Sequence, residues 1–353
     1  MEILELIVAL AVILIAAELF TNGIEWFGHK LDLAEGVVGS VLAAVGTALP
    51  ETMIPLVAIL FAGSSGSSDA AHEIGVGAIL GAPFMLSTLA MFVTGLGVIA
   101  YAKRRSSGTV MIVDTHVMGL DIRYFFVAYA IAVGAAFVPA DLSFLRYGAV
   151  VALLGIYAWY IKSHFEADTT VDAKDLAPLR FHRVDRLGYR DDPKTPRLRV
   201  VNLQVLVALA MIVGGAYVFV QAITQLSTRA GLDPTLLALV IAPIATELPE
   251  KFNSLIWVRQ NKDTLAMGNI TGAMVFQSVI PTSIGIVLAA SAWTISQDTL
   301  LSFASAGIAF LSTAVIFIPM VRRGSLSGPN LLIGGFFYLV YLALVLTKLA
   351  GLW

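Results

Sequence analysis

Two near-copies of one short acidic motif lie inside long apolar segments of the chain. Residues 46–51 read GTALPE and residues 245–250 read ATELPE. If those segments span a bilayer, Glu51, Glu247 and Glu250 lie near its middle. An ionisable side chain at that depth costs roughly 2.5–3.5 kcal/mol to insert, so it marks a function that needs it. A pathway for cations is the simplest function that three such carboxylates predict.

Composition indicates a chain that crosses a membrane several times. Apolar residues make up 58% of the 353 positions and charged residues only 13%, which a soluble globular domain does not approach. The first residues lack the basic stretch of a cleaved signal peptide, and the apolar run behind them is long enough to span, so we count it as the first transmembrane helix. The chain has no cysteine, which excludes disulfides, thiolate metal sites and a cysteine nucleophile.

Apolar runs of about 20 residues predict about ten transmembrane helices. Pro50, Pro83, Pro249 and Pro281 fall inside four of the longer runs and predict breaks or kinks there. The predicted spans are residues 4–27, 33–62, 75–101, 122–139, 142–162, 200–226, 233–258, 263–291, 299–321 and 330–351.

The basic residues predict how these helices are oriented. Most of the 22 Lys and Arg residues fall in or beside alternate loops, including the cluster at 103–105, Arg123 and the stretch 163–199. Because cytoplasmic loops carry the excess of Lys and Arg, both termini are expected outside and residues 163–199 in the cytoplasm. The helix with Glu51 then runs from inside to outside, and the helix with Glu250 runs the opposite way.

The duplication extends beyond the acidic motif. Residues 77–82 read GAILGA and residues 268–273 read GNITGA, each in the apolar run that follows a motif. The first half has extra residues at the glycine- and serine-rich stretch 63–69, which we expect to be a flexible outer loop. We therefore predict an all-α polytopic membrane protein with a five-plus-five inverted repeat. Its parts are a first repeat at 1–162, a cytoplasmic linker at 163–199 and a second repeat at 200–353.

Inverted repeats of this kind place the substrate site at the midplane, where their broken helices meet. Proline removes the hydrogen bond to a carbonyl about one turn earlier, which frees carbonyl oxygens near Gly46 and Ala245. Hard cations such as calcium take six to eight oxygen ligands from carboxylates, carbonyls, amides and water. We expect Glu51 and Glu250 to bind the cation. Glu247 lies near the same helix face as Glu250, so it either joins them or reaches another cavity.

The paired Thr-x-Leu-Pro-Glu motifs, each followed by a Gly-x-x-x-Gly-small helix, resemble the two alpha repeats of the cation/calcium exchanger superfamily. That group contains sodium/calcium exchangers and proton-coupled cation exchangers, and the resemblance covers the whole ten-helix plan. It implies a central cation site built from the second, third, seventh and eighth helices, across which the first and sixth helices slide. It also implies that Glu51 and Glu250 bind calcium and that Thr47 and Thr246 are further ligands.

The sequence departs from the superfamily pattern at several ligand positions. A serine usually follows each motif threonine, and here Ala48 and Glu247 take that place. The helix after each motif usually supplies a serine and an Asn or Asp, and the matching residues here are Ala82, Leu86, Ala273 and Gln277. Most neutral oxygen ligands are therefore lost and one carboxylate is gained. Gln277 is expected to complete a reduced site or to hydrogen-bond Glu247.

The charges and the missing hydroxyls indicate which exchange to expect. A divalent cation bound by three carboxylates leaves one negative charge, which one proton neutralises. Sodium sites in such exchangers depend on serine and threonine hydroxyls, and several of these are missing here. We therefore expect a secondary active antiporter that moves a divalent cation, calcium first, in exchange for protons by alternating access. Three alternatives stay open: sodium coupling, transport of manganese or magnesium, and a cation-binding membrane protein that does not transport.

An enzyme is the least favoured class. Membrane transferases usually display aspartate-rich metal motifs at helix ends, and neither such a motif nor a paired nucleophile is evident in this sequence. We expect no cofactor other than the transported cation and its counter-ion, proton or sodium. The expected partners are membrane lipid and inorganic cations, with no nucleic acid. The expected location is the inner, or plasma, membrane of a prokaryotic cell.

Overall fold

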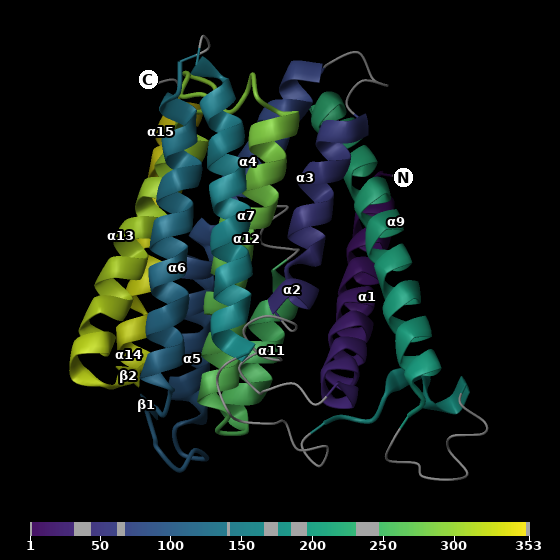
Figure 1. Cartoon of the computed structure of the whole chain (residues 1–353), viewed down its shortest axis with the longest axis vertical. Coiled ribbons are helices and arrows are strands. Elements are labelled where there is room, and N and C mark those ends of the chain that lie inside the picture. Colours follow the sequence, from purple (N-terminus) through teal and green to yellow (C-terminus); the bar gives the residue numbers. More distant parts are fainter. Residues whose placement is uncertain are drawn as a thin grey trace.

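Membrane-length helices run along the long axis of the molecule (Figure 1). The computed structural model describes residues 2–31, 44–61, 68–139, 142–165, 176–184, 196–230 and 247–350. Within these residues, 8 helices are long and apolar enough to cross a membrane. The second and seventh expected spans are described only in part, because residues 32–43 and 231–246 lie outside the described ranges.

The first half of the chain supplies five of the expected spans. A π-helical turn at Leu86–Ala90 joins α4 to α5, so that these two helices form one span. A single 3-10 turn at Ala135–Phe137 ends α6. The helices are α1 (Glu2–Lys30), α2 (Ala44–Thr47), α3 (Leu49–Phe61), α4 (Ser68–Met85), α5 (Met91–Tyr101), α6 (Thr115–Gly134) and α7 (Phe144–Phe165).

The second half repeats this order after a linker that contains a 3-10 turn at Arg180–Val184. Helix α13 ends at Gly324, whose φ of 68° is a left-handed conformation that glycine adopts without strain. The helices are α9 (Leu198–Ala230), α11 (Leu248–Arg259), α12 (Asp263–Leu288), α13 (Leu300–Arg323), α14 (Gly328–Leu331) and α15 (Ile333–Leu349).

The two half-helices that follow the acidic motifs run in opposite directions. Helix α3 begins near the middle of the long axis and runs upward in Figure 1, whereas α11 occupies the lower half and ends at the bottom. Both helices begin at equivalent motif residues, Leu49 and Leu248. The inverted relationship that the charge pattern predicts is therefore present in the fold.

Helices α1 and α9 form a pair that stands beside the main bundle (Figure 1). They pack extensively on each other, and their small apolar cores are separate from the large core that the other helices share. Met53 of α3 packs against both of the small cores. The buried residues of these cores are Ala9, Ile13, Ala16, Phe20, Ala208, Ile212 and Phe219.

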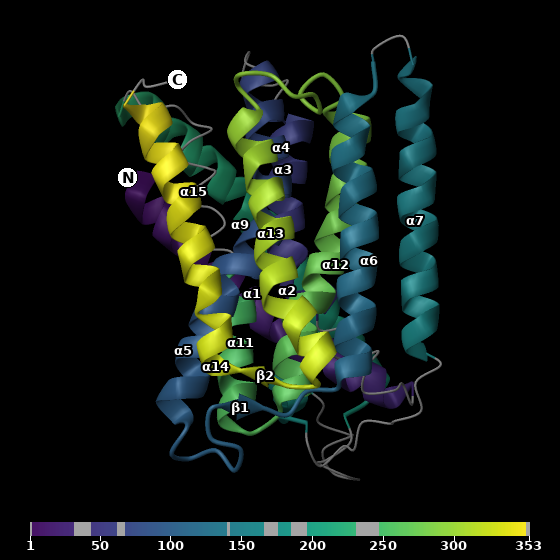
Figure 2. The same cartoon turned by 90° about the vertical axis from the view of Figure 1, so that its left-hand side faces the viewer.

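A short two-stranded sheet closes one end of the main bundle. Strand β1 (Val110–Met111) follows α5 and pairs antiparallel with β2 (Leu326–Ser327), which follows α13. In the same region the N-terminus of α12 approaches the segment after β1, since Asp114 N donates to Thr264 Oγ1 at 3.1 Å. The connections of both repeats are thereby tied together at the end of the bundle that carries β1 and β2 (Figure 2).

Several expected boundaries differ from those in the structure. The fourth span was expected from 122, but α6 begins at Thr115 because Asp114 caps it, accepting hydrogen bonds from the backbone of His116 and Val117. Arg123 consequently lies within α6 and not beside a loop. The expected loop at 63–69 also ends earlier than predicted, because α4 begins at Ser68. Residues 62–67 lie outside the described ranges.

Part of the predicted linker packs on the α1 and α9 pair. Helix α7 continues to Phe165 and α9 begins at Leu198. Leu179 is buried in a small cluster with Trp26 and Val201. The carbonyl oxygen of Ala177 accepts a hydrogen bond from Trp26 Nε1 at 2.8 Å.

Candidate cation site

The two acidic motifs interrupt their helices at equivalent residues. Ala48 separates α2 from α3, and Glu247 immediately precedes α11 with φ −81° and ψ 4°. Pro50 and Pro249 are each the second residue of the half-helix that follows, a position where proline disturbs no helical hydrogen bond. Both half-helices therefore start where the proline-containing motif predicts a break.

Glu51 and Glu250 are each the third residue of a half-helix. The first turn of a helix carries partial positive charge and interacts favourably with a carboxylate. Glu51 is buried, with 6% of its surface exposed. Gly46, the first carbonyl candidate, is a buried residue of α2.

Helix α12 is the element around which the site is arranged. It contacts α2, α3, α4 and α11, and α2 also contacts α11. The ends of the two broken helices therefore meet on one shared helix. This arrangement brings the elements that carry Glu51 and Glu250 together from opposite halves of the chain.

Part of the expected ligand set lies outside what the structure describes. Ala245 and Thr246 precede the described residues of the second motif, and the side chains of Thr47 and Glu250 are not described. Among the side chains that are described, no group of three or more His, Asp or Glu residues could hold a metal ion.

Gln277 is a completely buried amide on α12. Neither its Oε1 nor its Nε2 has a hydrogen-bond partner in the described part of the chain. The neighbouring hydroxyls differ, because Ser278 and Thr282 donate to carbonyls of their own helix. A buried amide without a partner is costly, which favours a ligand that the fold alone does not supply.

The positions that lack family ligands are filled by apolar packing. Ala82, Leu86 and Ala273 are buried at 3%, 0% and 0% exposure. Leu86 opens the π-helical turn, in which Ser87 and Thr88 donate to the carbonyl of Phe84. These hydroxyls satisfy their own helix, so the described residues of this turn add no free hydroxyl to the site.

Glu247 forms an ion pair that the sequence analysis did not predict. Its Oε2 accepts a hydrogen bond from Nζ of Lys251 at 2.9 Å, one helical turn later. The Glu247 side chain is fully buried and that of Lys251 is 6% exposed. The spacing of four residues is a local signal that could have revealed this pair. Hydrogen bonding between Gln277 and Glu247 is not present, because neither amide atom of Gln277 has a partner within the described ranges.

A second buried polar cluster joins α6, α7 and α12. Asp121 Oδ1 accepts from Tyr160 at 3.0 Å and lies 3.0 Å from His164 Nε2, and its Oδ2 accepts from Thr271 at 2.6 Å. Thr271 belongs to the glycine motif at 268–273 in the same helix as Gln277. No local sequence pattern pairs these residues, because they come from three separate spans.

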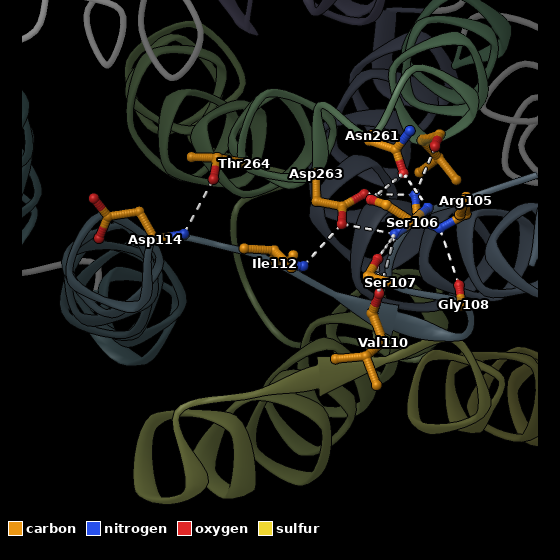
Figure 3. Close-up of polar contacts among 11 residues, drawn as sticks. Arg105, Ser106, Ser107, Gly108, Val110, Ile112, Asp114, Asn261, Asp263 and Thr264 are labelled. Carbon is orange, nitrogen blue, oxygen red and sulfur yellow. Dashed lines mark hydrogen bonds and ion pairs between the residues drawn. The ribbon is translucent and has the colours of Figure 1, made fainter.

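A third cluster fastens the connections at the end of the bundle. Arg105 donates to both carboxylate oxygens of Asp263, and Asp263 also accepts from the backbone of Ile112 (Figure 3). Arg105 further donates to the carbonyl of Val258 at 2.6 Å. This cluster, called the Arg105 clamp below, holds the C-terminal end of α11 next to the N-terminal end of α12.

Three features define a membrane transporter of the inverted-repeat class. They are the membrane-length helices, the two opposed half-helices that begin at buried acidic residues, and the separate pair of α1 and α9. A profile of the sodium/calcium exchanger protein family matches residues 1–162 and 201–350. The chain therefore belongs to the sodium/calcium exchanger family, whose members are antiporters and not a class of enzymes.

Two curated relatives match most of the chain. A protein named CaxA, from Alkalimonas amylolytica, is 24% identical over 283 residues, covering 80% of this chain and 79% of its own. Inner membrane protein YrbG of Escherichia coli (strain K12) is 23% identical over 279 residues, covering 78% of this chain and 76% of its own.

Two solved structures share the fold. The H+/Ca2+ exchanger CAX matches with a TM-score of 0.76 at 15% identity, covering 97% of this chain and 82% of that chain. The sodium-calcium exchanger NCX_Mj, soaked with Na+ and Sr2+, matches with a TM-score of 0.61 at 15% identity, covering 97% of both chains. The sodium/calcium exchanger-like fold predicted from the paired motifs is confirmed.

Proposed function

We propose that this antiporter moves a divalent cation, with calcium as the leading candidate, in exchange for protons. The observation that carries the proposal is the pair of opposed half-helices that place Glu51 and Glu250 at equivalent first-turn positions beside α12. Similarity to proteins described as H+/Ca2+ and sodium-calcium exchangers supports calcium as the cargo.

In this proposal Glu51 and Glu250 supply the negative charge that binds the cation. Gln277 offers an amide oxygen from α12, and Thr47 and Thr246 offer hydroxyls. The carbonyl oxygens of Gly46 and Ala245 complete the set, since the prolines of the motifs withdraw their hydrogen-bond donors. Glu247 belongs to the same motif, but its charge is shared with Lys251.

Protons are favoured over sodium as the counter-ion because the site is poor in hydroxyls. Ala48, Ala82 and Ala273 stand where the family usually has serines, and all three are buried apolar residues. Carboxylates accept protons directly, whereas a sodium ion needs several neutral oxygen ligands. Sodium coupling is the alternative that the gradient experiment below distinguishes.

Alternating access is assigned to motion of the α1 and α9 pair against the main bundle. The separate apolar cores of the pair allow it to move as one unit, while the shared core holds the other helices together. The repeats at 1–162 and 200–353 supply one helix each to the pair. The excess of basic residues in alternate loops favours both termini outside and the linker at 163–199 in the cytoplasm. The location that we propose is the inner membrane of a prokaryotic cell.

The test is calcium uptake into proteoliposomes under an imposed pH gradient and, separately, a sodium gradient. We expect uptake under the pH gradient in the wild type and none in Glu250→Gln that inserts and folds normally. Uptake driven only by the sodium gradient would mean that sodium, and not the proton, is the coupling ion. Absence of uptake of calcium, manganese and magnesium under both gradients, with folded protein, would reject the antiport of divalent cations.

A further inference from the structure

We propose that Lys251 is a tethered cation that neutralises Glu247, so that the charge of the transported cation is balanced by Glu51 and Glu250 alone. This inference rests on the proposed function, because it concerns the charge of the same site. It assigns to Lys251 a role in deciding how many free cations the site takes.

The contact between the two residues is direct and shielded from solvent. Nζ of Lys251 lies 2.9 Å from Oε2 of Glu247, with side-chain exposures of 6% and 0%. The pair is built within one helical turn, where residues four apart face each other. Opposite charges at this distance interact far more strongly away from water than at a protein surface.

The first repeat has uncharged residues at the positions that match Glu247 and Lys251. Aligning the motifs pairs Glu247 with Ala48 and Lys251 with Thr52. Thr52 Oγ1 donates to the carbonyl of Ala48 at 2.9 Å, so the same two positions are in contact in both repeats. At these two positions the second repeat therefore has one acid and one base where the first repeat has two uncharged residues. Their net charge is zero, unlike that of a single added carboxylate.

Glu247 keeps one oxygen that Lys251 does not occupy. Its Oε1 is buried and has no hydrogen-bond partner within the described ranges. That oxygen is available to a cation as a ligand, much as a neutral amide oxygen would be. Substitutions can remove the charge of Glu247 and keep a side-chain oxygen at the same position, so the two properties can be tested separately.

The charge count of the site changes accordingly. Three carboxylates alone require a proton in addition to a divalent cation, whereas Glu51 and Glu250 together balance a divalent cation without one. Lys251 thus takes the place of one mobile monovalent cation. Because it is covalently attached, it stays when the cargo leaves.

The test is a charge series of calcium binding on purified full-length protein. Glu247→Gln leaves the lysine unbalanced, so we expect calcium affinity to fall by about tenfold or more. Lys251→Met leaves an extra negative charge, so we expect calcium affinity to rise and calcium release to slow. The double variant Glu247→Gln with Lys251→Met keeps a side-chain oxygen without either charge, and its affinity is expected to return to within about threefold of wild type. A purely structural pair would weaken binding in both single variants.

One further variant and one further measurement make every outcome decisive. Glu247→Ala with Lys251→Thr copies the first repeat and removes the oxygen as well, so a loss confined to this variant would show that Oε1 is a ligand while leaving the charge assignment in place. If the double variant Glu247→Gln with Lys251→Met binds calcium as weakly as Glu247→Gln alone, the inference is overturned. If the wild type binds no calcium, the proposed function fails. Thermal unfolding of the single and double variants then tests whether Glu247 and Lys251 interact. Additive changes in melting temperature would then overturn the pairing.

Discussion

Arg105 and Asp263 form a buried two-pronged ion pair that joins the α5 to α6 connection to the start of α12. Nη1 lies 2.7 Å from Oδ1 and Nη2 lies 2.7 Å from Oδ2. The same guanidinium also donates to the carbonyls of Gly108 and Val110 (Figure 3). A further hydrogen bond runs to the carbonyl of Val258. Planar, paired donors of this kind are specific to arginine. The Arg105 clamp fixes the junction between α11, which begins in the second motif, and α12.

Removing this arginine is expected to destabilise the fold. Arg105→Ala leaves the buried Asp263 carboxylate without its cation, and breaking a buried pair costs about 3–5 kcal/mol. Arg105→Lys should recover only part of that loss, because one ammonium cannot make both contacts. Thermal unfolding in detergent measures the effect. The control is Arg104→Ala at the exposed neighbouring position, and equal losses from Arg104→Ala and Arg105→Ala would refute the role of the clamp.

Gln277 offers a test in which stability and transport move in opposite directions. Gln277→Leu copies the first repeat, which has Leu86 at the matching position. It removes a buried amide whose missing hydrogen bonds cost about 1–3 kcal/mol, so we expect the melting temperature to hold or rise. If the amide binds the cation, calcium uptake should fall by about tenfold, as loss of one good ligand contact implies. Unchanged uptake with raised stability would exclude Gln277 from the site.

The proposed motion of α1 and α9 can be tested by crosslinking, since the chain has no native cysteine. A short crosslink between cysteines at Ile13 and Met53 joins the pair to the bundle, and we expect it to stop uptake reversibly. The matched control joins α1 to α9 through cysteines at Ile13 and Gly215, because a Cβ at Gly215 would lie 2.8 Å from Ile13 Cγ1. That crosslink should leave most of the uptake in place. The reverse result would mean that α1 and α9 move against each other.

The Asp121 cluster is expected to hold α12 in position against α6 and α7. Asp121→Ala leaves Tyr160, His164 and Thr271 without their shared acceptor, so we expect a loss of about 3–5 kcal/mol in the free energy of unfolding. Arg123→Gln is the control, because Arg123 is exposed on the same helix and should change stability by less than about 0.5 kcal/mol. Equal melting temperatures for Asp121→Ala and wild type would show that the cluster is dispensable.

The sequence predicts features that depend on local chemistry and on repetition. Proline after the motif threonine predicts where α3 and α11 begin, because its missing N–H is tolerated only in a first turn. The asymmetric Lys and Arg pattern predicts the opposed directions of these helices. The start of α6 was predicted late because the polar residues after Thr115 hide the helix from a hydropathy count, although Asp114 is a normal helix cap.

Contacts between distant spans could not be predicted in the same way. Asp121 meets Thr271 through tertiary packing, and Arg105 reaches Asp263 from the other repeat. The pairing of Glu247 with Lys251 could be predicted from their spacing of four residues along one helix. The assignment of Thr47, Thr246 and Glu250 as ligands stays a prediction from the motifs.

The central claim is that both half-helices contribute to one cation site. Equilibrium binding of radioactive calcium to purified protein tests it most directly, by comparing wild type with Glu51→Gln and Glu250→Gln. We expect the wild type to bind one calcium ion per chain at the midplane site and each single variant to lose that binding while remaining folded. Retention of binding in either variant at wild-type affinity would contradict a single site shared by the two repeats.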